Sequence, residues 1–212
     1  MRGRNKPWAK DFIAEHGDLI YKSDENVASK KTLEVGIGKG DFIVSNAKAN
    51  EDMLHIGVEL NTSIFAMAMK KVVNDDLKNV RLLNIKALDL PNYITEGSIS
   101  KIYLNFSDPW PQNGYRKRRL VHPIHLELFE SLLVNGGEII FKTDNLNLFE
   151  MGVNNFKTRN YEISFLEYDY QLIDSDFITE YESKFRALNM PIYRVVAKIN
   201  KNDLKSWGDA MK

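Results

Sequence analysis

Residues Leu33–Ile43, "LEVGIGKGDFI", decide the fold that we predict from this sequence. They lie at the junction between an apolar, strand-like stretch, Lys31–Val35, and a segment whose apolar residues repeat with helical periodicity. The glycine-rich turn Gly36–Gly40 joins the two. A strand, a tight turn and a helix in this order form the first part of a β-α-β unit.

The alternation between strand-like and helix-like segments continues along the chain. Further strands are expected at His55–Leu60, Val80–Ile85, Lys101–Phe106 and Glu138–Thr143, and in the tail at Tyr161–Tyr170 and Ile192–Ile199. Helices are expected after a cap at Asn61 or Thr62, from Pro123 to just before Gly136 and Gly137, from about Asn145, and over Asp174–Leu188. This alternation predicts an α/β fold with a mostly parallel sheet and helices on both faces. The tail breaks the alternation, so its strands are expected to form an antiparallel edge.

Composition restricts the class of protein. The chain has 212 residues, 43% of them apolar, which is enough for one well-filled domain, 1–212. It has no cysteine, no stretch of about 20 apolar residues and no signal-like segment, so we expect a cytoplasmic protein without a membrane partner. Residues 1–30 are expected to form a basic N-terminal extension that could be mobile. The four histidines lack metal-ligand spacing, so no metal site is expected.

The glycine turn indicates the kind of ligand. A dinucleotide fingerprint requires G-x-G-x-x-G, which would place a glycine where Asp41 stands. The sequence is instead E-x-G-x-G-x-G, formed by Glu34, Gly36, Gly38 and Gly40. A carboxylate beside the loop would repel phosphate and attract a cation, so the pattern favours a sulfonium or amino-acid group. An ordinary strand-to-helix turn remains the alternative.

A second acid follows the next strand. Glu59 lies close to the spacing of about 20 residues at which a carboxylate meets ribose hydroxyls in nucleotide-binding α/β folds. An ionised carboxylate can accept hydrogen bonds from both hydroxyls. We therefore predict a nucleoside-bearing cofactor at the carboxyl ends of adjacent strands. The alternative is that Glu59 only supplies negative charge to the start of the next helix.

The most unusual stretch is Ile102–Leu120, "IYLNFSDPWPQNGYRKRRL". Asp108 ends a buried strand at the same edge of the predicted sheet, and Pro109 and Pro111 restrict the turn that follows. Trp110 offers a flat face for a base or the cofactor, or else covers the core. We interpret Asp108 as part of a reaction centre, with simple solvation as the alternative.

Four consecutive cations, Arg116, Lys117, Arg118 and Arg119, follow this turn. Such a run usually forms a solvated face. Beside a ligand cleft, however, cations of this density are better explained as contacts to the phosphates of a nucleic acid. We therefore predict that a polyanion lies across this loop.

Two further acidic stretches could contact a base. Asp144 ends the fifth strand, and Thr179–Glu182, "TEYE", adds Glu180 and Glu182 in the tail. Guanine presents adjacent N–H donors that suit a carboxylate. The alternative is that both glutamates of the tail are ordinary exposed helix residues.

Nearly the whole chain resembles the bacterial tRNA (guanine-N7)-methyltransferases. The resemblance is carried by "MRGRNKPWAKDF", "LEVGIGKGDFI", "IGVEL", "YLNFSDPWP", "KRRL", "FKTDN", "TEYESKF" and "PIYR". It implies a Rossmann-like fold, S-adenosylmethionine as the methyl donor, and N7 of a variable-loop guanosine in tRNA as the acceptor.

The resemblance also implies roles for particular residues. Cofactor-binding residues are expected to be Glu34, Gly36, Gly38, Gly40, Glu59, Lys86, Ala87 and Asp108, and Asp108 is also the catalytic candidate. Substrate-binding residues are expected to be Gln112, Arg116, Lys117, Arg118, Arg119, Asp144, Thr179, Tyr181 and Glu182. Two of these depart from the family pattern, because Lys86 replaces an acid and Gln112 replaces a lysine. The first leaves the Ala87 backbone N–H for adenine, and Arg116 could compensate for the second.

This chemistry requires no general base, because guanine N7 carries a free lone pair and no proton. Alignment at about 3–3.5 Å can supply the catalysis, with Asp108 as an electrostatic and positioning group. Two other functions stay open from the residues alone: an NAD-dependent oxidoreductase, and an RNA-binding protein whose cofactor site has decayed. A monomer and a homodimer are both compatible with the sequence.

Overall fold

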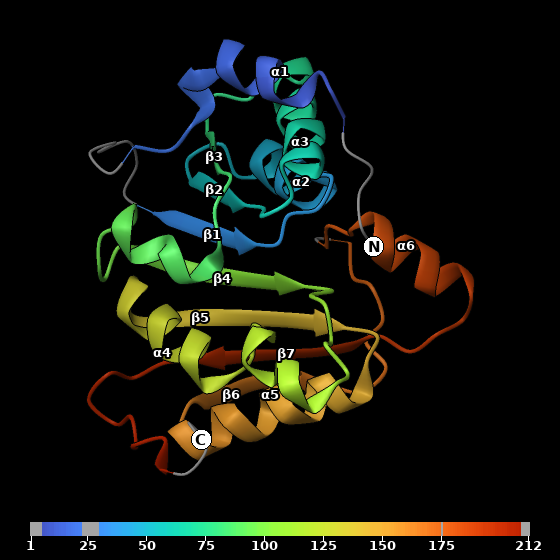
Figure 1. The fold of residues 1–212 in the computed structure, drawn as a ribbon. Helices are drawn as coiled ribbons and strands as arrows, with labels where there is room; N and C mark the ends of the chain where they lie inside the picture. Colours follow the sequence, from blue (N-terminus) through green and yellow to red (C-terminus); the bar gives the residue numbers. More distant parts are fainter. Residues whose placement is uncertain (1–5, 23–29, 175, 209–212) are drawn as a thin grey trace.

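The computed structural model describes residues 6–22, 30–174 and 176–208. Its centre is a seven-stranded sheet in the order β3-β2-β1-β4-β5-β7-β6 (Figure 1). The strands are β1 Lys31–Val35, β2 Leu54–Val58, β3 Val80–Leu83, β4 Ile99–Asn105, β5 Leu133–Thr143, β6 Glu162–Glu167 and β7 Tyr193–Lys198. All the strands predicted from the sequence are present, with small shifts at their ends.

The sheet is parallel except at one strand. β1 pairs in parallel with β2 and β4, β2 with β3, and β4 with β5. β7 is inserted antiparallel between β5 and β6. In Figure 1 the arrow of β7 points opposite to those of β1, β4 and β5. The predicted Rossmann-like fold with an antiparallel edge is confirmed, and β6 forms the outermost strand.

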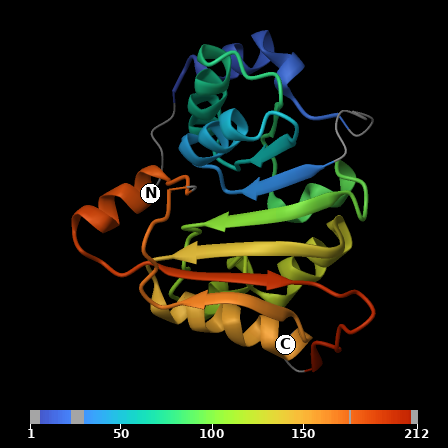
Figure 2. The same ribbon diagram turned by 180° about the vertical axis from the view of Figure 1, so that it is seen from behind.

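Helices cover both faces, as predicted. The α-helices are α1 Ala9–Glu15, α2 Asp41–Ala49, α3 Thr62–Asn74, α4 Pro123–Leu132, α5 Leu146–Arg159 and α6 Glu180–Ala187, and the 3₁₀ helices are η1 Gly17–Leu19, η2 Ala87–Asn92 and η3 Asn113–Arg118. α2 and α3 lie on one face and α4 and α5 on the other (Figures 1 and 2). Each face has its own cluster of buried apolar side chains. Phe65 and Met69 belong to one, and Phe129 and Phe149 to the other.

Side-chain caps determine where the main helices begin. The Asn61 side chain accepts hydrogen bonds from Ser63 N at 3.0 Å and Ile64 N at 3.1 Å, so Asn61 rather than Thr62 is the cap of α3. Asn145 caps α5 by accepting from Leu148 N at 2.9 Å. These caps place the helix starts directly after the strands that carry the site.

Two predicted helix boundaries are wrong. α4 ends at Leu132, and Gly136 and Gly137 lie inside β5 rather than just after the helix. The reason is pairing with the tail: Gly136 N donates to Ile199 O, and Ile199 N donates to Gly137 O, both at 2.9 Å. The helical segment expected within Asp174–Leu188 is limited to α6.

The N-terminal extension expected at 1–30 is described only in part, because residues 1–5 and 23–29 lie outside the described residues. Its described part, 6–22, packs on the body of the protein through α1 and α3. Lys6 N donates to Ser63 Oγ at 3.0 Å, and Phe12 and Ile13 pack against the core on this face. In the described ranges, no helix combines the length and apolar character needed to cross a membrane.

Candidate active site

The glycine turn lies between β1 and α2 and uses all three glycines in left-handed conformations. The φ angles are +84° at Gly36, +54° at Gly38 and +83° at Gly40. A Cβ at Gly40 would also lie 2.9 Å from the Ala68 Cβ of α3. The third glycine is therefore needed both for the turn and for close packing of two helices, which explains why it stands immediately before Asp41.

Glu34 lies buried in β1, directly below this turn. Its Oε1 accepts a hydrogen bond from Asn105 Nδ2 at 3.0 Å. Within the described residues, Glu34 Oε2 and Asn105 Oδ1 have no hydrogen-bond partner. Burial raises the pKa of the Glu34 carboxyl to about 8, although the hydrogen bond from Asn105 opposes this. Two unused buried acceptors at one point suit a ligand that brings a cationic donor.

Glu59 follows β2 and is fixed by backbone donors. Its Oε2 accepts from Gly38 N at 3.2 Å and its Oε1 from Asn61 N at 2.8 Å. Burial raises the pKa of Glu59, the backbone N–H donors oppose the rise, and the charge of Asp108 adds to it. The charge of Glu59 in turn contributes to the raised pKa of Glu34. The three predicted carboxylates are therefore close enough to interact electrostatically at one edge of the sheet.

A narrow pocket of about 50 Å³ opens between the glycine turn, the end of β4 and α6, and of the three carboxylates only Glu34 lines it. Its walls include Glu34, Gly36, Gly38, Asn105, Phe106 and Tyr181. Figure 1 shows α6 beyond the arrowheads of β1 and β4, where an open α/β sheet binds its ligand. A larger groove of about 670 Å³ adjoins it and is lined by α2, α3 and α6, including Lys39, Lys71 and Thr179.

The loop after β4 has a strained backbone. Phe106 and Trp110 adopt positive φ values of +51° and +40°, which cost energy for residues with a side chain. Phe106 N donates to Lys142 O at 2.9 Å, and Arg119 Nη2 donates to Trp110 O at 2.9 Å. These two hydrogen bonds hold the loop at both ends. Asp108 is exposed between them.

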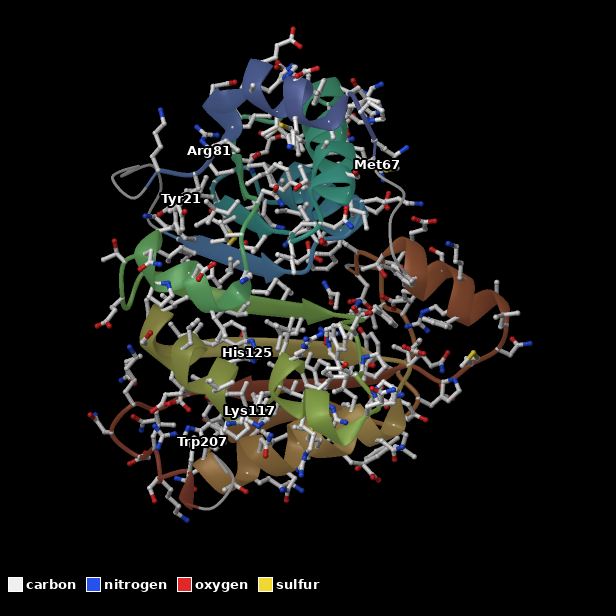
Figure 3. All side chains as sticks on the ribbon, viewed as in Figure 1. Tyr21, Met67, Arg81, Lys117, His125 and Trp207 are labelled. Carbon is white, nitrogen blue, oxygen red and sulfur yellow. The ribbon has the colours of Figure 1, made fainter. Side chains whose placement is uncertain are left out.

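The four cations predicted to bind phosphate differ in their contacts. The Arg118 guanidinium lies over the rings of Trp110 and Tyr115, at 4.9 and 4.4 Å. Arg119 is tied to the loop through its hydrogen bonds to Trp110 O. Arg116 and Lys117 are exposed, and neither side chain has an ion-pair or hydrogen-bond partner in the described part of the chain. Figure 3 labels Lys117 on this segment.

In the "TEYE" stretch the first three residues line the pocket and the fourth is buried in the protein interior. Thr179 caps α6 by accepting from Glu182 N at 3.0 Å, and Tyr181 is exposed and lines the pocket. Glu182 is fully buried, with its oxygens 2.7 Å from Lys142 Nζ and from Arg186 Nη2. The alternative that Glu182 is an exposed helix residue is therefore wrong, and Glu182 is not among the residues that line the pocket.

Four other predicted residues do not line the pocket. Lys86 is exposed where β3 gives way to η2, and Ala87 is the first residue of η2. Gln112 is exposed before η3, and Asp144 is half-buried after β5. Contacts between these four residues and a ligand therefore stay predictions.

The structure brings residues to the site to which the sequence analysis gave no role. Asn105 and Phe106 line the pocket, and Lys142 pairs with Glu182. Glu180, named above as a possible base contact, lines the pocket and pairs with Lys39 at 2.7 Å. Asn105 and Phe106 lie within the "NFSDPWP" motif and Lys142 within "FKTDN", so motif membership was the available signal.

Comparison with known proteins agrees with this geometry. A family model described as "Putative methyltransferase" matches residues 28–195. The tRNA (guanine-N(7)-)-methyltransferase of Geobacillus sp. (strain WCH70) is 42% identical over 93% of this chain and 96% of its own length. The enzyme of the same name from Bacillus subtilis (strain 168) is 40% identical over 92% of this chain and 97% of its own length.

Solved structures of low sequence identity share the fold. The 16S rRNA methyltransferase KamB superposes with a TM-score of 0.62 at 13% identity, over 88% of this chain and 93% of that one. A mutant of the 16S rRNA (adenine(1408)-N(1))-methyltransferase from Catenulisporales acidiphilia gives a TM-score of 0.61 at 10% identity, over 93% of both chains. With about 40% identity to its named relatives over more than nine-tenths of its length, this chain belongs to the tRNA (guanine-N(7)-)-methyltransferase family.

Proposed function

We propose that this protein transfers a methyl group from S-adenosylmethionine to N7 of a variable-loop guanosine in tRNA. The observation that carries the proposal is the pair of unused buried acceptors, Glu34 Oε2 and Asn105 Oδ1, below the glycine turn. A pyrophosphate offers acceptors and no donors, so it would leave these two buried acceptors unpaired, which disfavours the NAD-dependent alternative. The named relatives support the choice of tRNA and of guanine N7.

The residues present fit the donor. Glu34 and Asn105 would accept hydrogen bonds from the ammonium group of S-adenosylmethionine. The turn at Gly36–Gly40 would let the protein backbone approach the donor closely, and Glu59 would accept from the ribose hydroxyls. When bound, S-adenosylmethionine supplies an activated methyl group on a positively charged sulfur. Because Glu59 already accepts from two backbone N–H groups, its orientation is fixed before the ligand arrives.

The protein's part in the reaction is positioning and charge stabilisation. Guanine N7 needs no deprotonation, so no residue has to act as a base. Asp108 lies at the end of β4 on a loop held by hydrogen bonds at Phe106 and Trp110. Its carboxylate would stabilise the positive charge that passes to the purine ring. The strained, fixed loop keeps Asp108 in place without reorganisation during the reaction.

The tRNA is proposed to reach the site over η3 and α6. Arg116 and Lys117 are free to contact phosphates, whereas Arg118 and Arg119 shape the loop that presents them. Thr179, Tyr181 and Asp144 remain candidates for the target base, and Gln112 remains a candidate beside them. All these residues come from one chain, so a monomer could carry out the reaction, with a homodimer as the alternative.

The test is incubation of the purified protein with methyl-labelled donor and unmodified tRNA, followed by digestion and mapping of the labelled nucleoside. We expect label in 7-methylguanosine at a single variable-loop position. Label at another atom or position would reject the proposed acceptor. Absence of transfer together with binding of S-adenosylhomocysteine and tRNA would favour the non-catalytic RNA-binding alternative.

A further inference from the structure

Lys142 is a buried cation without an assigned role so far, although its charge lowers the pKa of Glu34. It lies in β5, and its side chain is only 4% exposed. Placing an ammonium group inside a protein is costly unless partners compensate it. Its Nζ lies 2.7 Å from Glu182 Oε2 and 3.3 Å from Phe177 O, and 5.8 Å from the centre of the Phe42 ring. These partners come from α6 (Glu182), from the segment that leads into it (Phe177) and from α2 (Phe42), which borders the pocket.

The ion pair fixes the first turn of α6. Glu182 also accepts from Arg186 Nη2 at 2.7 Å and Nε at 3.1 Å, and its backbone N–H donates to the Thr179 cap. Glu182 is therefore held through its side chain by Lys142 and Arg186, and through its backbone N–H by Thr179. Tyr181, its immediate neighbour, is left exposed at the pocket.

The backbone of Lys142 holds the opposite wall of the pocket. Its carbonyl accepts the hydrogen bond from Phe106 N at 2.9 Å, at the point where the Asp108 loop begins. The Phe106 ring then stacks on Phe185 of α6, with centroids 6.0 Å apart. One residue of β5 thus contacts both the catalytic loop and the helix that faces it.

We propose that Lys142 is a positioning residue. Its buried ion pair with Glu182 fixes the positions of Thr179 and Tyr181 relative to the Asp108 loop. This role rests on the proposed function, because it assigns those two side chains to the acceptor base. Glu182 acts through α6 and does not itself contact the guanine. A purely structural ion pair would instead affect only the stability of the fold.

The first readout is kinetic and uses Lys142→Met, Lys142→Arg, Glu182→Gln and the double variant Lys142→Met/Glu182→Gln. We expect Lys142→Met to lower kcat/KM for tRNA at least tenfold. The affinity for S-adenosylhomocysteine should fall by a smaller factor, because removal of the Lys142 charge raises the pKa of Glu34. Lys142→Arg should recover part of the loss, because it restores a cation at Glu182. In the Glu182→Gln background, Lys142→Met should add little, since the partner is already neutral.

Arg159→Met is the matched control. It breaks another largely buried ion pair, Arg159 to Glu130 at 2.8 Å, between α4 and α5. Its effect on the unfolding midpoint should match or exceed that of Lys142→Met, with kcat/KM for tRNA nearly unchanged at a temperature where both are folded. Equal kinetic losses in the two variants, or additive losses in the double variant, would overturn the positioning role.

The second readout does not depend on activity. Hydrogen exchange should show loss of protection in Lys142→Met at Glu180–Ala187, with α5 protected as in the parent protein. Unchanged protection of α6 would reject the anchor, even if tRNA methylation is confirmed. Loss of protection confined to α6 in a protein that methylates no tRNA would retain the anchor and reject the proposed function. Glu182→Gln supplies the same two readouts if Lys142→Met does not fold.

Discussion

Asn105 donates a hydrogen bond from Nδ2 to Glu34 Oε1 at 3.0 Å, joining the end of β4 to β1 just before the glycine turn. One acceptor on each residue stays unused among the described residues. The contact links the two sequence motifs, because "LEVGIGKG" supplies the carboxylate and "NFSDPWP" supplies the amide that orients it. The ionisation of Glu34 is therefore a property of the assembled site.

Donor binding is predicted to depend on pH through Glu34. Its pKa of about 8 in the folded protein lies above the ordinary 4.5. As the pH rises between these values, the unfolded chain loses the proton that the folded protein keeps, so the free energy of unfolding falls. Pairing with a cationic ligand needs the ionised form, so affinity for S-adenosylhomocysteine should rise between pH 6 and 8, by at most about tenfold per unit. Calorimetry of S-adenosylhomocysteine binding at pH 6.5, in two buffers of different ionisation enthalpy, should detect the release of up to one proton on binding.

Glu34→Gln is the control for this prediction. It should bind more weakly at pH 8 and lose most of the pH dependence, since no carboxyl remains to titrate. A parent protein whose affinity is flat from pH 6 to 8, without proton release, would show that Glu34 does not meet a cationic group.

Asp108→Asn is predicted to lower kcat without unfolding the protein. The substitution keeps the shape of an exposed side chain but removes the charge that would stabilise the alkylated purine. We expect a loss of about 100-fold, the scale found when one preorganised electrostatic contact is removed. Single-turnover methylation measures the chemical step, and thermal unfolding should give a midpoint close to that of the parent. An unchanged single-turnover rate would remove Asp108 from the mechanism.

Arg116 and Lys117 are predicted to contribute to tRNA affinity through phosphate contacts. Each alanine substitution should make the dependence of log affinity on log salt concentration shallower by about 1. Lys157→Ala, at the far end of α5, should leave the slope unchanged. Arg119→Ala should act differently and lower kcat, because it releases the Trp110 carbonyl and loosens the Asp108 loop. Identical salt slopes in all four variants would place the RNA elsewhere.

Gly40→Ala is predicted to destabilise the fold by at least about 1–3 kcal/mol. The new methyl group would lie 2.9 Å from Ala68 Cβ in a backbone with φ of +83°. Gly17→Ala is a suitable control, because its Cβ would meet nothing within 4 Å. Urea unfolding measures the stability of both variants. Equal free energies of unfolding for Gly40→Ala and Gly17→Ala would show that α2 and α3 can separate at no cost.

The sequence was sufficient for the order of elements and for bringing the three candidate carboxylates to one edge of the sheet. Glu34, Glu59 and Asp108 could be placed together because parallel strands bring their carboxyl ends to one edge. The acceptor side was less predictable, since local pattern cannot show which side of a short helix is buried. The sequence around Glu182 is typical of an exposed helix, but the residue is buried because it pairs with Lys142 from β5. Gly136 and Gly137 resemble a helix stop for the same reason, because their partner is Ile199.

Replacement of one atom in the substrate tests the central claim most directly. A tRNA carrying 7-deazaguanosine at the variable-loop position keeps the shape and the Watson–Crick edge of guanosine but has carbon in place of N7. We predict full labelling of the unsubstituted tRNA, no labelling of the deaza tRNA, and competitive inhibition by the latter with a Ki near the KM. Methyl transfer to the deaza tRNA at a comparable rate would contradict the account.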